Sequence, residues 1–132
     1  MSESKKILIV DDEESVVTYL ETLLQDHGYT TVSAGDGVEA LEKARAERPD
    51  LITLDINMPK ESGIRFYRDL KDDPDLTATP VAIVTAVTGY GGKPEEFQRW
   101  ISTRKQVPAP EAFLAKPIER DAFIAKVREI LS

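Results

Sequence analysis

Ile7-Leu8-Ile9-Val10-Asp11-Asp12 opens with four apolar residues in a row and closes with two carboxylates. The run from Lys6 to Val10 is nearly continuous in apolar character, which is typical of a parallel strand that helices cover on both faces. Three later apolar runs also end in a polar or charged residue. They are Leu51–Leu54 before Asp55, Val81–Val84 before Thr85, and Ala112–Ala115 before Lys116.

Segments with helical periodicity separate these runs. Apolar residues recur at helical spacing from Glu14 to His27, where Gly28 favours a helix stop. The other predicted elements are a strand over Tyr29–Ser33, helices from Val38 to near Pro49 and from Ile64 to Leu70, a helix over about Glu95–Thr103, and a last helix from Phe123 to Leu131. This alternation of five strands with five helices predicts an α/β fold with a doubly wound parallel sheet.

Length and composition exclude several classes of protein. The 132 residues have the size of one domain, and a net charge of −7 argues against binding of nucleic acid by this domain. The chain has no cysteine and a single histidine, His27, so disulfides and histidine-rich metal centres are excluded. Because no apolar stretch approaches the ~20 residues that span a bilayer, we expect a cytoplasmic protein without a membrane segment.

The polar residues that follow the strands are expected to form one site. In an open α/β sheet the ligand crevice lies at the carboxyl ends of the strands. Three carboxylates there, from Asp11, Asp12 and Asp55, would repel one another by about 4 kcal/mol per pair at ~4 Å in a medium of effective dielectric ~20. They therefore favour a hard divalent cation with oxygen ligands, Mg²⁺ first and Mn²⁺ as an alternative.

Phosphoryl chemistry fits this set of side chains. The ammonium group of Lys116 and the hydroxyl of Thr85 suit phosphoryl oxygens. Asp55 stands alone after a buried strand and could act as a nucleophile that forms an aspartyl phosphate.

The chain resembles the receiver domain of two-component response regulators, and in plan it is similar to the stand-alone chemotaxis regulator. The matching motifs are Asp11-Asp12, Asp55-Ile56-Asn57-Met58-Pro59 with Gly63, Thr85-Ala86, and Lys116-Pro117. The resemblance implies a single receiver domain over 1–132 with a flavodoxin-like (βα)₅ fold and a five-stranded parallel sheet in the order 2-1-3-4-5.

The resemblance also implies a role for each acidic residue and its neighbour. Asp55 resembles the phospho-accepting aspartate, Asp12 the direct metal ligand, and Asp11 the ligand that acts through water. Asn57 would offer its backbone carbonyl to the metal. Asn57 and Val87 resemble the positions that tune the lifetime of the phosphoryl group.

The remaining matched positions concern the binding of phosphoryl oxygens and a conformational switch that follows phosphorylation. Thr85 and Lys116 would bind phosphoryl oxygens, and Lys116-Pro117 resembles the cis peptide of the family. Phe113 occupies the place of a rotating aromatic switch residue, although a plain core role for one aromatic in a strand carries equal weight.

By this resemblance the phosphoryl donor is a sensor histidine kinase or a histidine phosphotransfer protein. Such a domain catalyses its own phosphorylation and dephosphorylation without being a conventional enzyme. Phosphorylation would change the surface of the fourth helix, fifth strand and fifth helix, which a downstream protein target or a second copy in a phosphorylation-dependent homodimer would read.

The segment at about 87–111 departs from the family pattern, being longer than usual by roughly two helical turns. It carries Val107-Pro108-Ala109-Pro110 before the fifth strand. Partner specificity and a tolerated loop extension are equally compatible with it.

Four questions remain open from the sequence. Asp11-Asp12 alone could be a turn and helix N-cap. The chain could be a phosphohydrolase of the haloacid-dehalogenase kind, although Asn57 stands where that group has a second acid. It could also be a pseudo-receiver that binds partners without phosphorylation. The chain could be a stand-alone regulator or a receiver excised from a longer protein.

Overall fold

The computed structural model describes residues 5–55, 62–86, 112–116 and 118–131. The elements in chain order are β1 (Lys6–Val10), α1 (Glu14–Asp26), β2 (Thr30–Ala34), α2 (Gly37–Glu47), β3 (Leu51–Leu54), α3 (Ser62–Asp72), β4 (Val81–Ala86), β5 (Ala112–Lys116) and α5 (Arg120–Leu131). Strands and helices alternate from β1 to β4 as the sequence predicts, and α5 follows β5. The helix expected near 95–103 and the extended segment at 87–111 lie outside the described residues.

The strands form one parallel five-stranded sheet in the order β2-β1-β3-β4-β5. This confirms the predicted fold class and strand order. β1 lies inside the sheet, with Val10 paired to Ala34 of β2 on one side and to Leu54 of β3 on the other. β1 and β3 therefore end at the same level, which brings the residues after Val10 and after Leu54 to one edge of the sheet.

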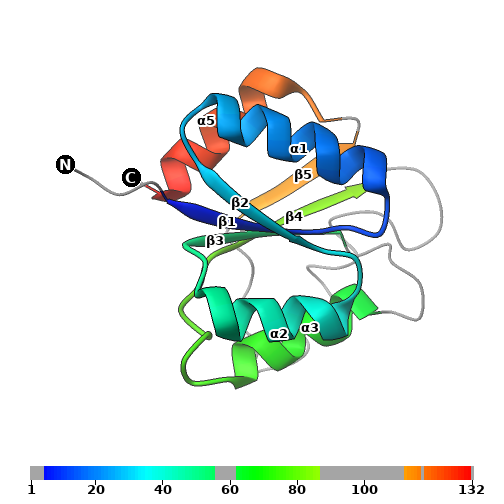
Figure 1. The fold of residues 1–132 in the computed structure, drawn as a ribbon, viewed down its shortest axis with the longest axis vertical. Coiled ribbons are helices and arrows are strands. Elements are labelled where there is room, and N and C mark those ends of the chain that lie inside the picture. The colour runs from blue at the N-terminus through cyan, green and yellow to red at the C-terminus, as the bar shows by residue number, and fades with distance from the viewer. Residues whose placement is uncertain (1–4, 56–61, 87–111, 117, 132) are drawn as a thin grey trace.

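Helices cover both faces of the sheet, as Figure 1 shows: α1 and α5 pack on one face, and α2 and α3 on the other. Alternate side chains of β1 point to opposite faces because a strand has a period of two. Leu8 and Val10 belong to the core under α2 and α3, whereas Ile7 and Ile9 belong to the core under α1 and α5. The continuous apolar run of β1 is thus explained by burial on both sides.

The predicted stop of the first helix is confirmed at His27 and Gly28. His27 is the C-cap of α1, and Gly28 has a φ of +90°, a conformation that a residue with a side chain rarely adopts. The N–H of Gly28 donates to the carbonyl of Gln25 at 3.0 Å, and the N–H of Tyr29 donates to that of Leu24 at 3.1 Å. This Schellman pairing satisfies the last carbonyls of α1 and turns the chain into β2.

A variant of the capping box begins α2, in which Glu39 bonds the N–H of Gly35 rather than that of the N-cap Asp36. The carboxylate of Asp36 accepts from the N–H of Glu39 at 2.8 Å, and the carboxylate of Glu39 accepts from the N–H of Gly35 at 2.8 Å. Two backbone donors at the start of the helix are thereby satisfied.

Across the described residues, none of the helices is long and apolar enough to cross a membrane.

Candidate functional site

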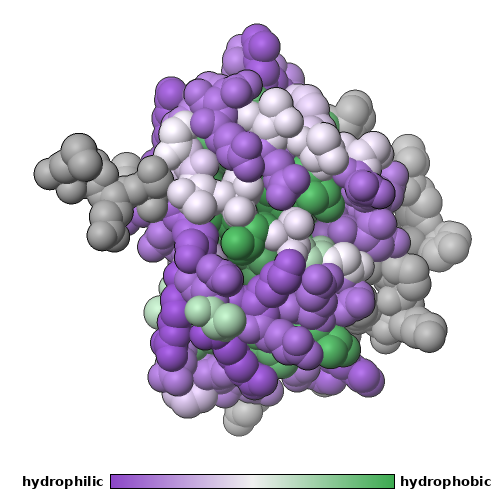
Figure 2. Space-filling model, in the orientation of Figure 1, coloured by the Kyte–Doolittle hydropathy of each residue, from purple (hydrophilic) through white to green (hydrophobic). Residues whose placement is uncertain are grey.

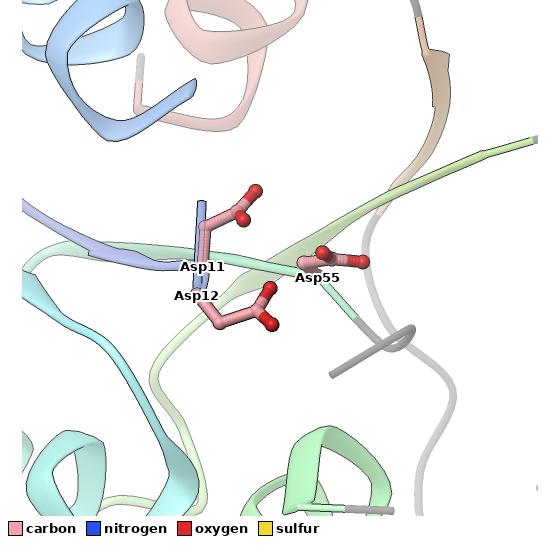
Figure 3. A group of neighbouring side chains, drawn as sticks. All are labelled: Asp11, Asp12 and Asp55. Carbon is pink, nitrogen blue, oxygen red and sulfur yellow. The ribbon is translucent and has the colours of Figure 1, made fainter. Parts of the chain in front are cut away.

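Three carboxylates gather at the carboxyl edge of the sheet. Asp11 and Asp12 follow β1 and Asp55 follows β3, and one carboxylate oxygen from each lies within 4.8 Å of the others. Figure 3 shows the three side chains around one space beyond the strand ends. Asp11 and Asp55 are each only 3% exposed, whereas Asp12 is exposed to solvent. The cluster is therefore buried on one side and open on the other.

The main chain of the sheet holds these residues in place. The N–H of Asp11 donates to the carbonyl of Ala34 at 3.1 Å, which continues the pairing of β1 with β2 by one residue. The sequence pattern predicts a third strand from Leu51 to Asp55, whereas β3 ends at Leu54 and Asp55 is the residue that follows it. The positions of both residues thus follow from strand register and depend little on their own side chains.

The carboxylate of Asp11 has a local role as well. Its Oδ1 atom accepts a hydrogen bond from the N–H of Glu13 at 2.9 Å. The N-cap of α1 is Glu13, whose side chain makes no capping hydrogen bond. The alternative in which Asp11-Asp12 is itself the N-cap is therefore wrong, although Asp11 does stabilise the turn that leads into the helix.

The donor set fits a hard divalent cation. All three side chains offer carboxylate oxygens, which are the ligands that Mg²⁺ prefers, and the exposed side of Asp12 leaves room for the waters that this ion keeps. Like charges at this separation also repel one another, and a cation would offset that repulsion. The cluster of aspartates predicted from the sequence is confirmed as a geometric group.

Thr85 and Lys116 are brought to the same edge by β4 and β5. Thr85 pairs with Ala115, and Ala86 pairs with Lys116, at the carboxyl ends of these strands. β4 is paired to β3 directly, with Leu54 opposite Ile83. The backbone therefore places the hydroxyl-bearing and ammonium-bearing residues on the edge where the three aspartates lie.

Phe113 lies in β5 opposite Ile83 of β4, which is the level of the sheet where β3 ends. Its place in the fifth strand agrees with the sequence prediction. Asn57, Val87 and Pro117, to which the resemblance gives metal, lifetime and cis-peptide roles, lie outside the described residues.

A groove beside the cluster was not predicted from the sequence. A cavity of about 690 Å³ has Asp12 in its lining and continues between α2 and α3. The sequence indicates on which helix face the apolar lining residues lie. The space between the two helices, however, depends on the distance at which they pack. No sequence pattern reports that distance.

The fold and the cluster together define a class: a doubly wound, flavodoxin-like α/β domain with an acidic pocket at the carboxyl edge of its sheet. The chain belongs to the response regulator receiver domain family, whose model matches residues 7–128. Receiver domains of this family interact with histidine kinases and with downstream targets.

Two relatives illustrate the range of the family. The chain is 38% identical over 128 residues to the alkaline phosphatase synthesis transcriptional regulatory protein PhoP of Bacillus subtilis, covering 97% of this chain and 49% of that protein. It is 35% identical over 127 residues to the polar-differentiation response regulator DivK of Brucella anthropi, covering 96% of each. The chain thus spans about half of the first relative and nearly all of the second.

Solved structures agree with the fold. The chemotaxis protein CheY4 of Vibrio cholerae superposes with a TM-score of 0.81 at 33% identity, covering 97% of this chain and 99% of that one. The signal receiver domain of a signal transduction histidine kinase from Syntrophus aciditrophicus gives 0.79 at 30% identity, covering 97% and 90%.

Proposed function

We propose that this chain is a phospho-accepting receiver in which Asp55 takes a phosphoryl group from a phosphohistidine donor. The observation that supports this most directly is the cluster of Asp11, Asp12 and Asp55, with carboxylate oxygens within 4.8 Å at the carboxyl edge of the sheet. Three carboxylates this close repel one another, and a cation bound among them would offset that repulsion.

In the proposed step a carboxylate oxygen of Asp55 attacks the phosphorus atom in line with the leaving group. An oxygen–phosphorus bond forms as the phosphorus–nitrogen bond of the donor breaks, and the imidazole leaves with the electron pair and takes up a proton. With a small acyl phosphate, the carboxylate of the acid leaves instead. The product is a mixed anhydride on Asp55.

Asp11 and Asp12 would hold a Mg²⁺ or Mn²⁺ ion, with Asp55 as a third acidic neighbour and the Asn57 carbonyl as a further ligand. The ion would supply positive charge to the phosphoryl oxygens. The hydroxyl of Thr85 and the ammonium of Lys116 would bind the other phosphoryl oxygens, and their positions at the ends of β4 and β5 support this assignment.

The same residues would serve the return reaction, in which water attacks the phosphorus and regenerates the Asp55 carboxylate. Asn57 and Val87 would border the approach of this water and set the lifetime of the phosphoryl group. Catalysis by the domain would then be limited to its own phosphorylation and dephosphorylation.

The output would pass through the end of the sheet formed by β4 and β5. Movement of Thr85 toward the phosphoryl group would open space for Phe113 and alter the surface next to α5. The proposed readers of that surface are a downstream protein target or a second copy of the chain. A sensor histidine kinase or a histidine phosphotransfer protein would supply the phosphoryl group in the cytoplasm.

The experiment that tests the acceptor is chemical mapping of the phosphorylated residue. The protein is incubated with acetyl phosphate and Mg²⁺ and then reduced with borohydride, which converts an aspartyl phosphate to homoserine. Peptide mass analysis should find homoserine at position 55. Conversion at exposed acids such as Asp26 but not at Asp55 would contradict the proposal.

A further inference from the structure

The groove between α2 and α3 has an apolar floor. Val38 and Leu41 of α2 and Phe66 of α3 line the cavity of about 690 Å³ that begins at Asp12. Val38 is 73% exposed. Among the described residues, Val38 and Tyr19 are the exposed large hydrophobic side chains.

The groove continues along both helices. A second hollow of about 480 Å³ shares Leu41, Arg45 and Asp69 with the first and extends it to Pro74, beyond the end of α3. Each helix has 11 residues, which corresponds to a length of about 16 Å. The residues that line the two hollows run from Gly37 to Arg45 on α2 and from Arg65 to Asp72 on α3, which is about two helical turns.

The rim of the groove is acidic. Six carboxylates line the two hollows, against the two guanidinium groups of Arg45 and Arg65. Arg45 is paired with one of these six, because its Nε donates to the carboxylate of Asp73 at 3.2 Å, which leaves five carboxylates and the guanidinium group of Arg65 along the two hollows. Figure 2 shows hydrophobic surface within the α2–α3 layer surrounded by hydrophilic surface.

We propose that this groove binds a basic amphipathic helix of a partner protein. An apolar stripe on such a helix would pack on Val38 and Leu41, which keep exposed surface, in the manner of helix-in-groove recognition. Phe66 is only 1% exposed and lines the cavity as part of the core. Lysine or arginine residues beside the stripe would face Glu42 and Asp69 on opposite walls. Complementarity of charge and of apolar surface thus selects one class of partner.

This docking surface lies on the α2–α3 face of the sheet, away from α1 and α5 (Figure 1). A partner bound there would leave the face of α1 and α5 accessible to a second protein. Binding of a helix in this groove requires neither a phosphoryl group nor a metal ion, and metal-free conditions therefore test it separately from the proposed function.

The test is an NMR titration in EDTA with a 14-residue synthetic peptide. The peptide carries leucines at i, i+3, i+4 and i+7, with lysines on both sides of that stripe. We expect the largest amide shifts in α2 and α3, and weaker binding at higher salt. Two control peptides replace the leucines by glutamine or the lysines by glutamate, and neither should bind measurably.

Matched variants localise the interaction. Val38→Ser should weaken binding about tenfold by removing an apolar contact, whereas Tyr19→Ser removes the other exposed hydrophobic side chain and should have no effect. Glu42→Lys should weaken binding. Asp26→Lys on α1 makes the same change of charge outside the groove, and it should weaken binding only by the general effect of net charge. Circular dichroism establishes that each variant is folded.

Several results would overturn the inference. They are no binding at millimolar peptide, shifts confined to other elements, equal binding of the glutamine peptide, or affinity that Val38→Ser and Glu42→Lys leave unchanged. Equal binding of the glutamine peptide would mean that net charge alone attracts the probe.

Discussion

The backbone N–H of Asp55 donates a hydrogen bond of 2.9 Å to the carbonyl oxygen of Val10. This bond extends the pairing of β3 with β1 by one residue beyond Leu54 and sets Asp55 beside Asp11, the residue that follows Val10. Since the geometry of the acidic cluster is set by main-chain pairing, isosteric substitutions of its side chains should change the charge while the backbone stays in place.

Asp12→Asn should stabilise the metal-free protein. Because Asp12 is exposed to solvent, its repulsion by a neighbouring carboxylate is closer to the water value of about 1 kcal/mol than to the ~4 kcal/mol of a partly buried pair. Urea unfolding in EDTA should show a higher midpoint with an unchanged slope. Mg²⁺ should then stabilise the wild type clearly and the variant much less, because the ion loses a ligand.

Asp26→Asn is the control for this effect, since Asp26 is an exposed acid at the end of α1 outside the cluster. It should respond to Mg²⁺ as the wild type does. An Asp12→Asn variant that is no more stable than the wild type in EDTA would mean that the three carboxylates do not repel one another appreciably.

Lys116→Ala should slow phosphorylation of Asp55 by acetyl phosphate about 100-fold, the size of effect typical of losing one stabilising group for the transferring phosphoryl oxygens. Mg²⁺ affinity should change far less, because the proposed metal ligands remain. Rates of adduct formation followed by mass spectrometry provide the measurement. Lys126→Ala on α5 is the matched control, and equal rates for the two variants would argue against the proposed role of Lys116.

Asp36→Ala should lower the free energy of unfolding by about 1 kcal/mol, the usual cost of losing an N-cap. The variant loses the hydrogen bond to the N–H of Glu39 at the start of α2. Asp26→Ala, which removes no capping bond, should leave stability nearly unchanged. Denaturant midpoints that fall equally for both variants would contradict the capping role.

Glu39 should contribute a pH-dependent part of the stability. The hydrogen bond from the Gly35 N–H lowers the pKa of this carboxyl from its ordinary value of 4.5, with a smaller contribution from Lys43. The unfolded state therefore binds the proton more readily, and stability rises with pH through this range. The contribution is fully present above pH 4.5 and is lost as the pH falls through the lower folded pKa.

Comparison of the wild type with Glu39→Gln from pH 3 to 7 checks this sign. The wild type should be more stable at neutral pH by about 0.5 kcal/mol, a size suited to an exposed charge. The difference should vanish on acidification. A difference that grows toward low pH would contradict the assignment.

Much of the fold could be predicted because its apolar residues recur with the spacing typical of buried strands and amphipathic helices. The bounds of β1 agree with the predicted Lys6–Val10, and His27-Gly28 identifies the end of the first helix. The gathering of Asp11, Asp12 and Asp55 followed from a general property of parallel sheets, namely that carboxyl strand ends share one edge.

Other features depend on distances that the sequence does not express. Lys71 is only 7% exposed, and its Nζ donates to the carbonyls of Thr77 and Thr79 at 3.2 and 2.8 Å. Lysine is rarely buried, so composition gives no sign of this arrangement. The start of α2, in contrast, could have been predicted from the sequence. Asp36 is followed three residues later by Glu39, a pattern typical of helix starts that an analysis of apolar periodicity alone does not detect.

Intact mass after incubation with acetyl phosphate is the most direct measurement of receiver chemistry. The wild type with Mg²⁺ should gain one phosphoryl group, while the Asp55→Ala variant and the wild type in EDTA should gain none. An adduct of equal extent on folded Asp55→Ala would contradict the assignment of Asp55. A folded wild type that gains nothing from acetyl phosphate or from a phosphohistidine donor would contradict phosphorylation itself.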